Sequence, residues 1–314
     1  MANAAYNCGG GGRIVLNMED VMKKAIVIML TGAMMLAAVA CGGGNSSNST
    51  PAAETQTEEA NPAEETAETV ESTVMETEET EANIPEEPMS YEDYIAAATD
   101  SEVIIQGSIQ GKQSYYVQDG AGTANVYLQD DKGGAYFLYQ LPCTEKEYEL
   151  METGKTIKVK GYKSEWSGEI EVVDIESWMF VDGDFIAEAE DVTALLGTDE
   201  LASKMNKKVV FKGMTVEART DKDGNPILDK DGKEVAFTYN SEGTGERGAD
   251  TDLYFNVSLN GQTYTFTVES YLCGPDTDVY KAVEDLHVGD VIDMEGFLYW
   301  YNGPNPHITA ILAQ

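Results

Sequence analysis

The sequence predicts a mainly β protein in which two tandem five-stranded barrels, each with a short helix, follow a disordered acidic N-terminal tether. Three observations lead to this prediction. A strand pattern bracketed by glycines occurs twice, apolar residues alternate around turn residues, and a short helical pattern occupies the same place in each copy.

The repeat is clearest in two eight-residue segments, 154–161 (GKTIKVKG) and 289–296 (GDVIDMEG), which match in their glycines and in their alternating apolar positions. The first strands match as well, with 103–107 (VIIQG) corresponding to 209–213 (VVFKG). Since a repeat of this quality indicates two domains of one fold, we expect domains at 89–185 and 186–314.

Each copy contains the same order of elements. Segments 125–139 and 253–269 each read as two strands around a turn, at 132–134 and at Asn260-Gly261. A capping box at Thr144 and Glu147 opens the helix of the first copy, and residues 276–286 form that of the second. Short helical segments at 91–98 and 199–205 precede the first strands. A helix between the third and fourth strands is the layout of the OB-fold, a partly open Greek-key barrel.

The segment 161–168 (GYKSEWSG) extends the resemblance. This motif, together with the repeat, is similar to a family of tandem OB-fold surface lipoproteins from anaerobic Gram-positive bacteria. The resemblance implies the fold and the location, and it implies no catalytic residues.

The N-terminal region predicts lipid anchoring at Cys41. Lys23 and Lys24 form a basic region, residues 25–35 an apolar region too short to span a bilayer, and 38–40 a run of small residues before Cys41 and three glycines. This pattern resembles a bacterial lipobox, although Ala38 stands where leucine is commoner. We therefore expect a signal peptide at 22–40, a start at Met22 with 1–21 as an upstream extension, and attachment to the extracytoplasmic face of the bacterial membrane.

Residues 41–88 are expected to be a disordered acidic linker. Residues 42–88 contain 13 glutamates, no lysine or arginine and no aromatic residue. Such a composition cannot bury enough apolar surface to offset the entropy lost on ordering, so a solvated spacer is the preferred interpretation.

The charge of the folded part argues against nucleic acid, which many OB-folds bind. Residues 89–314 hold 41 acidic and 17 basic residues, a net charge of −24. Since phosphate binding depends on lysine and arginine, nucleic acid is an unlikely partner.

Aromatic residues give the best candidate for ligand binding. The predicted hairpins between the fourth and fifth strands form one rim of the OB-fold ligand cleft. Their aromatic residues are Tyr162, Trp166, Tyr299, Trp300 and Tyr301. Either these side chains bind an extracellular glycan or protein, or Trp166 and Trp300 close the barrel ends and pack the domains together. The first alternative function is an envelope scaffold, and a hydrolase ranks third.

Other chemistry has little support in the sequence. His287 and His307 have no counterparts in the first copy, and no catalytic motif, metal spacing or cofactor motif is present. Cys143 and Cys273 lie at matching places and are expected to be separate buried thiols. An insertion of about 21 residues includes 221–234, where two Asp-Gly turns explain the pattern better than a calcium loop.

Overall fold

The computed structural model describes residues 84–312. The chain falls into two units, 1–74 and 75–314, and all described residues lie in the second. The predicted extension, the signal peptide, Cys41 and most of the linker lie outside the described residues. Within residues 84–312, no helix is long and apolar enough to cross a membrane.

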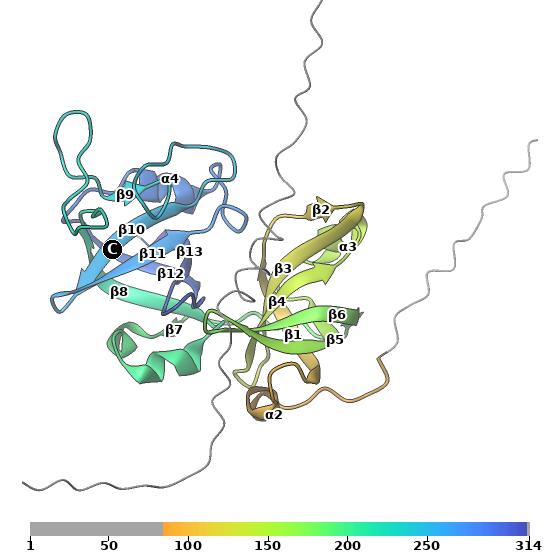
Figure 1. The fold of residues 1–314 in the computed structure, drawn as a ribbon. Helices are drawn as coiled ribbons and strands as arrows, with labels where there is room; N and C mark the ends of the chain where they lie inside the picture. The colour runs from red at the N-terminus through yellow and green to blue at the C-terminus, as the bar shows by residue number, and fades with distance from the viewer. Residues whose placement is uncertain (1–83, 313–314) are drawn as a thin grey trace, which may run out of the picture. The chain divides into compact units, whose positions relative to one another are not determined.

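The first barrel consists of strands β1, β3, β4, β5 and β6 (Figure 1). They pair in the order β1-β5-β6-β4-β3, and an additional β1–β3 pairing closes the sheet. β4 and β6 are parallel, whereas the other pairs are antiparallel. The elements of this part are α2 (Tyr91–Ala96), β1 (Glu102–Lys112), β2 (Tyr116–Gln118), β3 (Ala121–Gln129), β4 (Ala135–Pro142), α3 (Glu145–Leu150), β5 (Thr156–Trp166) and β6 (Glu169–Val181).

The second barrel, β8, β10, β11, β12 and β13, repeats this topology. Its order is β8-β12-β13-β11-β10, closed by a β8–β10 pairing, with β11 and β13 parallel. Both sheets therefore have the strand order of an OB-fold, and the predicted fold class is confirmed. The elements are β7 (Glu190–Asp191), η1 (Thr193–Leu195), η2 (Asp199–Lys204), β8 (Lys208–Glu217), β9 (Phe237–Thr238), β10 (Leu253–Leu259), β11 (Gln262–Val268), α4 (Asp278–Glu284), β12 (Val291–Phe297) and β13 (His307–Leu312).

Local chemistry accounts for the turns and helix ends that the sequence indicated. Thr144 and Glu147 form the predicted capping box before α3. The β10–β11 hairpin turns at Asn260 and Gly261, which both have positive φ, as a tight turn of the primed type requires. The helical segment expected at 199–205 is the 3₁₀ helix η2, whose neighbouring hydrogen bonds run between residues three apart.

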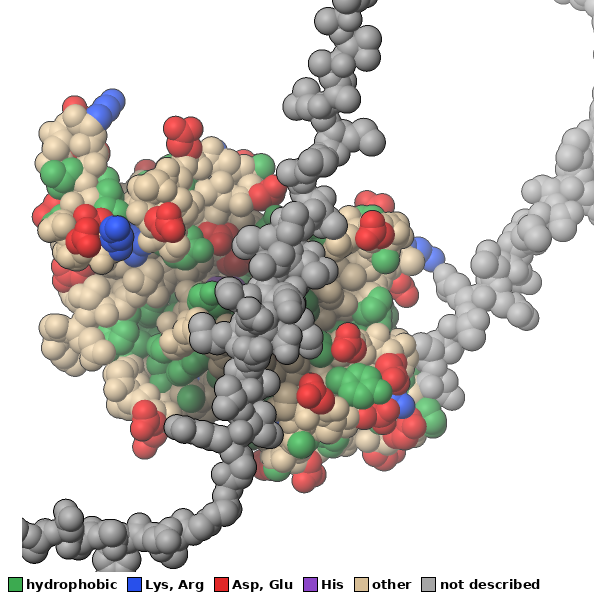
Figure 2. Space-filling view, in the orientation of Figure 1, with side chains coloured by type: hydrophobic (Ala, Val, Ile, Leu, Met, Phe, Trp, Pro, Cys, Tyr) green, Lys and Arg blue, Asp and Glu red, His purple; other side chains and the backbone are tan. Residues whose placement is uncertain are grey.

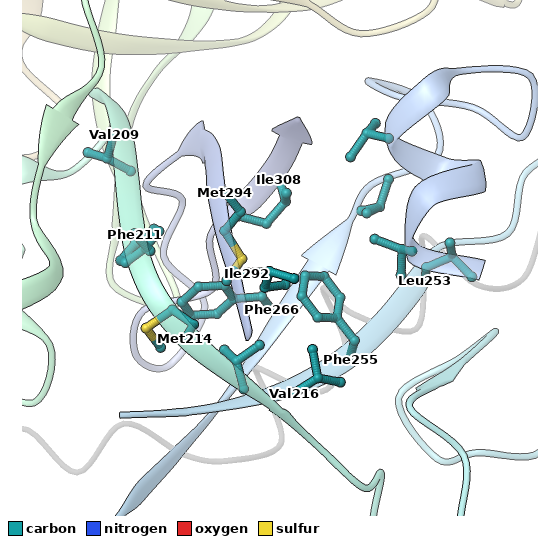
Figure 3. Packing of buried hydrophobic residues seen from close by; sticks show 14 of the residues in the cluster. Val209, Phe211, Met214, Val216, Leu253, Phe255, Phe266, Ile292, Met294 and Ile308 are labelled. Carbon is teal, nitrogen blue, oxygen red and sulfur yellow. The ribbon is translucent and has the colours of Figure 1, made fainter. Parts of the chain in front are cut away.

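Each barrel has its own apolar core. In the second barrel, Phe211 and Met214 on β8 point towards Phe255 and Phe266 on the facing strands (Figure 3). The rings of Phe211 and Phe266 lie 4.7 Å apart between centroids. Alternate residues supply these side chains, as the sequence pattern predicted, except in β8, where a shift in register against β12 brings both Phe211 and Met214 into the core.

The insertion between β8 and β10 contains two small turns. Asp221 accepts backbone N–H groups of Asp223 and Asn225, and Asp229 accepts those of Asp231 and Lys233. These hydrogen bonds lower the pKa of both aspartates. Both Asp-Gly turns predicted from the sequence, at Gly224 and Gly232, are therefore present.

The described chain begins within the segment expected to be linker. The side chain of Ile84 is buried, and Lys158 Nζ donates to the carbonyl oxygen of Ile84 over 2.7 Å. The end of that segment thus contacts β5 of the first barrel.

Candidate ligand-binding site

The second barrel covers the outer face of β3 and β4, which we call the inter-barrel contact. Tyr127 on β3 stacks on Phe297 of β12, with centroids 4.2 Å apart and planes at 4°. Phe137 on β4 meets the ring of Tyr299 edge-on at 5.5 Å. A Cβ atom at Gly111 would lie 2.8 Å from the Phe297 ring, so this glycine permits the close approach.

His307 belongs to this contact rather than to a catalytic group. It is buried, its ring stacks on Tyr299 at 4.4 Å, and Tyr127 Oη lies 3.0 Å from its Nδ1. Burial lowers the pKa of His307 to about 3 and raises that of Tyr127 well above its ordinary value. The imidazole is therefore neutral, and we assign its proton to Nε2, so that Nδ1 accepts the hydrogen bond from the Tyr127 hydroxyl group.

Two carboxyl groups of β6 lie in the same region. Glu169 is fully buried, and its Oε2 accepts the backbone N–H of Trp300 over 2.8 Å. Burial raises the pKa of Glu169 to about 8 and that of Glu171 to about 7.

A further hydrogen bond joins the two barrels, because the backbone N–H of Lys208 on β8 donates to Gln129 Oε1 on β3.

The structure separates the five aromatic residues proposed as one ligand surface. Tyr299 packs on Phe137 and His307, and Trp300 packs against the core of the second barrel and against Gly168. Packing thus accounts for Tyr299 and Trp300, whereas the sequence alternative had named Trp166 and Trp300 as the packing residues.

The remaining three candidates are more accessible. Trp166 and Tyr301, 52% and 50% exposed, pack together with centroids 5.2 Å apart at the tips of the two hairpins. Asn302 N donates to Ser167 O and joins these tips. Tyr162 lies on β5, where its hydroxyl donates to Glu176, away from the hairpin tips.

A pocket of about 260 Å³ opens at the end of the first barrel, and we call it the tyrosine pocket. Three half-exposed rings line it, Tyr116 and Tyr139 from the first barrel and Tyr271 from the loop after β11. Ser114 N and Oγ both donate to the carbonyl oxygen of Tyr271, which holds this loop against the first barrel. The complete lining is Gln113, Ser114, Tyr116, Thr123, Ala124, Asn125, Tyr139, Gln140 and Tyr271.

Two hydrogen bonds, one with a side chain and one with the backbone, orient the Asn125 amide in the pocket. Asn125 Nδ2 donates to Gln113 Oε1 over 2.6 Å, and Gln140 N donates to Asn125 Oδ1 over 2.8 Å. Gln140 has a φ of +53°, a conformation that costs a non-glycine residue free energy and is concentrated at functional sites. The pocket therefore combines aromatic faces with oriented hydrogen-bonding groups and has no charged residue in its lining.

The corresponding corner of the second barrel is filled by a side chain. Arg219 is buried and donates from Nη1 to Asn256 Oδ1, much as Gln113 meets Asn125 in the first barrel. Its Nε donates to Thr238 and its Nη2 to Ser241 O, so the insertion is fastened over this corner. The two barrels are thus not equivalent as binding modules.

The sequence reasoning did not select Tyr139, Tyr271 or the pocket amides. Tyr139 lies two positions after Phe137 on the outward side of β4, so the alternation of that strand contained a usable signal. Tyr271 follows the end of β11, and its neighbours come from the other barrel. Sequence periodicity holds no information about that pairing.

Within residues 84–312, Cys143 and Cys273 are separate buried thiols, as predicted. Burial raises the pKa of Cys143 and of Cys273 to about 11. His287 is exposed beside Asp290, and neither histidine lines the tyrosine pocket.

No family model and no curated protein matches this chain. Among solved structures, it is similar to the wild-type single-stranded DNA binding protein from Thermus aquaticus (14% identity, 69% of this chain and 94% of that chain, TM-score 0.22). It is also similar to the hypothetical protein ygiW from E. coli (14%, 31% and 91%, 0.21) and to a replication protein A heterotrimer bound to ssDNA (9%, 74% and 70%, 0.25). Such low identities and TM-scores transfer no function, and the strand order defines this chain as a protein with two OB-fold barrels.

Proposed function

We propose that the protein is a non-enzymatic, lipid-anchored surface protein that binds a neutral extracellular glycan in the tyrosine pocket. The observation that carries the proposal is the uncharged pocket itself, in which three tyrosines surround a hydrogen-bonded row of amides. Aromatic faces pack on the C–H surface of sugar rings, and amides hydrogen-bond to their hydroxyl groups. The volume of about 260 Å³ suits one or two sugar units rather than a long chain.

Charge favours a neutral ligand over an anionic one. Asp250, Asp252 and Glu269 lie near enough to raise the pKa of Tyr271, after burial, which is the largest cause. Acidic side chains are spread over the visible face of the described residues, and basic ones are few (Figure 2). A phosphate, sulfate or uronate group would therefore be repelled as it approached.

The same facts weigh against nucleic acid. In OB-folds, the face of the second and third strands is the usual surface for oligonucleotides and oligosaccharides. Here the second barrel covers much of that face through Phe297 and Tyr299, which leaves the pocket end open. At that open end a nucleic acid would lack the positive groove that it needs, because the pocket lining contains no lysine or arginine.

The test is a binding screen by calorimetry with neutral soluble oligosaccharides, such as those of glucose, xylose and N-acetylglucosamine. An oligogalacturonide and a single-stranded oligonucleotide serve as anionic comparisons. Tyr139→Ala should weaken binding about tenfold or more, which corresponds to about 1.4 kcal/mol. The matched control is Trp166→Ala, which removes an aromatic ring of similar exposure outside the pocket.

The outcomes separate the candidate sites. If Trp166→Ala abolishes binding and Tyr139→Ala does not, the ligand binds at the hairpin tips. If no oligosaccharide binds the wild type, the glycan proposal is wrong, and the Trp166–Tyr301 pair then favours the scaffold role, with a protein partner at the exposed rings.

Anchoring is tested on the whole chain in a bacterial host. Cys41 would carry a lipid on its sulfur, so wild-type protein should fractionate with the membrane and incorporate labelled fatty acid. Cys41→Ala should lose the label and either remain as precursor or enter the medium. Membrane-associated wild type without lipid would contradict the proposed anchor.

A further inference from the structure

Glu169 and Asn206 leave two buried oxygen atoms without a hydrogen-bond partner in residues 84–312. Glu169 Oε2 accepts the N–H of Trp300, but Oε1 has no partner. Asn206 Nδ2 donates to Ile170 O, but Oδ1 has no partner. The Asn206 side chain is close enough to the Glu169 carboxyl group to affect its pKa. Glu169 belongs to β6 of the first barrel, whereas Asn206 and Trp300 belong to the part of the chain that forms the second.

Both unpartnered atoms are acceptors if Glu169 is ionised. A carboxylate oxygen and an amide oxygen cannot hydrogen-bond to each other, and each buried acceptor without a donor destabilises the fold. One proton on Oε1 removes both defects, because a carboxylic acid donates through its O–H and still accepts through its other oxygen. We propose that Glu169 is a neutral carboxylic acid in the folded protein and donates to Asn206 Oδ1, forming a proton-dependent latch between the two barrels.

The surroundings of Glu169 favour the neutral form. The titratable groups that interact with it are Glu171 on the same strand, Tyr91 and Tyr94 of α2, Tyr127 of β3, and Tyr299 after β12. All of them are neutral or negative, and no lysine or arginine of the described residues acts on this carboxyl. Burial raises the pKa of Glu169 to about 8, and this effect outweighs those of Asn206 and of the Trp300 N–H, which lower the pKa.

The direction of the pH effect follows from this. The folded state keeps the proton up to about pH 8, whereas the unfolded chain loses it near its ordinary pKa of 4.5. The stabilising contribution is therefore complete below about pH 4.5 and is lost as the pH rises through 8. Alkaline conditions should loosen the contact at Trp300 and Asn206 before they affect either core.

The latch also affects the ligand pocket, and this consequence rests on the proposed function. Tyr271 comes from the second barrel and lines the pocket with Tyr116 and Tyr139 of the first. Loosening the inter-barrel contact would move one wall away from the other two. Ligand affinity should accordingly fall as the pH rises past 8.

The first experiment is ligand-free and uses the whole protein. Glu169→Gln keeps the shape of the acid and supplies a permanent N–H donor, and Glu171→Gln is the matched control on the next outward position of β6. Denaturant unfolding from pH 5.5 to 9 should show Glu169→Gln losing up to a tenfold change in folding constant per pH unit between 5.5 and 7.5. Burial also raises the pKa of Glu171, to about 7, so Glu171→Gln should lose its own part of the dependence below pH 7 and keep the part between pH 7 and 8, which Glu169→Gln loses.

A direct measurement covers the case in which the variant does not fold. Carbon-13 NMR of uniformly labelled wild-type protein, with side-chain carboxyls assigned through bonds to their backbone, should show that the Glu169 carboxyl remains protonated at pH 7. If all glutamate carboxyls except Glu171 and Glu269 are ionised at pH 7, the latch is wrong. Glu169→Gln with an unchanged pH profile would overturn it equally. Neither result depends on whether a glycan binds.

Discussion

The ring of Tyr127 lies flat on the ring of Phe297, and the same tyrosine donates its hydroxyl to His307. One residue of the first barrel thus makes two different contacts with the second. The stack buries apolar surface, while the hydrogen bond satisfies a buried imidazole nitrogen. Substitutions can therefore measure the contribution of each contact to stability separately.

Phe297→Ala should destabilise the protein by about 3–5 kcal/mol, because it removes a buried ring and leaves a cavity beside Tyr127 and Gly111. Denaturant unfolding followed by tryptophan fluorescence measures the change. Since the ring lies between the barrels, the single transition of the wild type should broaden or split. The control is Val291→Ala, an exposed position on the same strand, and an equal loss there would contradict the assignment.

Tyr127→Phe should cost about 1–3 kcal/mol, because it keeps the stack and leaves His307 Nδ1 buried without a donor. The double variant Tyr127→Phe with His307→Phe removes both polar groups and should recover part of the loss. Thermal and urea unfolding of the four proteins form a double-mutant cycle. Strictly additive losses would show that the two side chains are not coupled.

Arg219→Met should release the insertion. Its guanidinium is buried and donates only to neutral groups of the described residues, two of which, Thr238 and Ser241 O, belong to the insertion. Limited proteolysis should cut residues 220–248 at least several times faster than in the wild type. Lys222→Met, at an exposed position of the same insertion, should leave the rate unchanged. Equal cleavage in all three proteins would mean that Arg219 does not hold the insertion.

Cys143 and Cys273 should react slowly with a thiol reagent at pH 8. Both are buried with a pKa raised to about 11, so little thiolate forms and access is restricted. In a chain starting at residue 42, two thiols should react after denaturation and essentially none before. Rapid labelling of the native protein would show that one site opens easily.

The sequence contained most of the information needed for each barrel. The glycine-bracketed repeat, the capping box at Thr144 and the Asn260-Gly261 turn are local signals, and the structure confirms all of them. They are readable because strand alternation and turn chemistry act over a few residues.

The arrangement between the barrels was not readable in the same way. A partial signal existed in the runs 126–128 and 136–138, where consecutive apolar residues indicate strands covered on both faces. That pattern predicts that the outer face of these strands is covered, but it does not show by which residues. Phe297 and His307, which contact Tyr127, lie about 170 residues further along the chain. For the same reason, the sequence left Trp300 open between ligand binding and packing, and only the structure shows that its backbone N–H donates to Glu169.

The corner of the second barrel at Arg219, which lies beneath the insertion, affects how many ligand molecules one chain can bind. A duplicated barrel would ordinarily offer two sites, but in the second copy the larger Arg219 takes the place of Gln113, and its hydrogen bonds hold the insertion over that corner. Under the proposed function, the stoichiometry should therefore be one ligand per chain, and a gain in avidity would come from many anchored chains side by side rather than from the duplication.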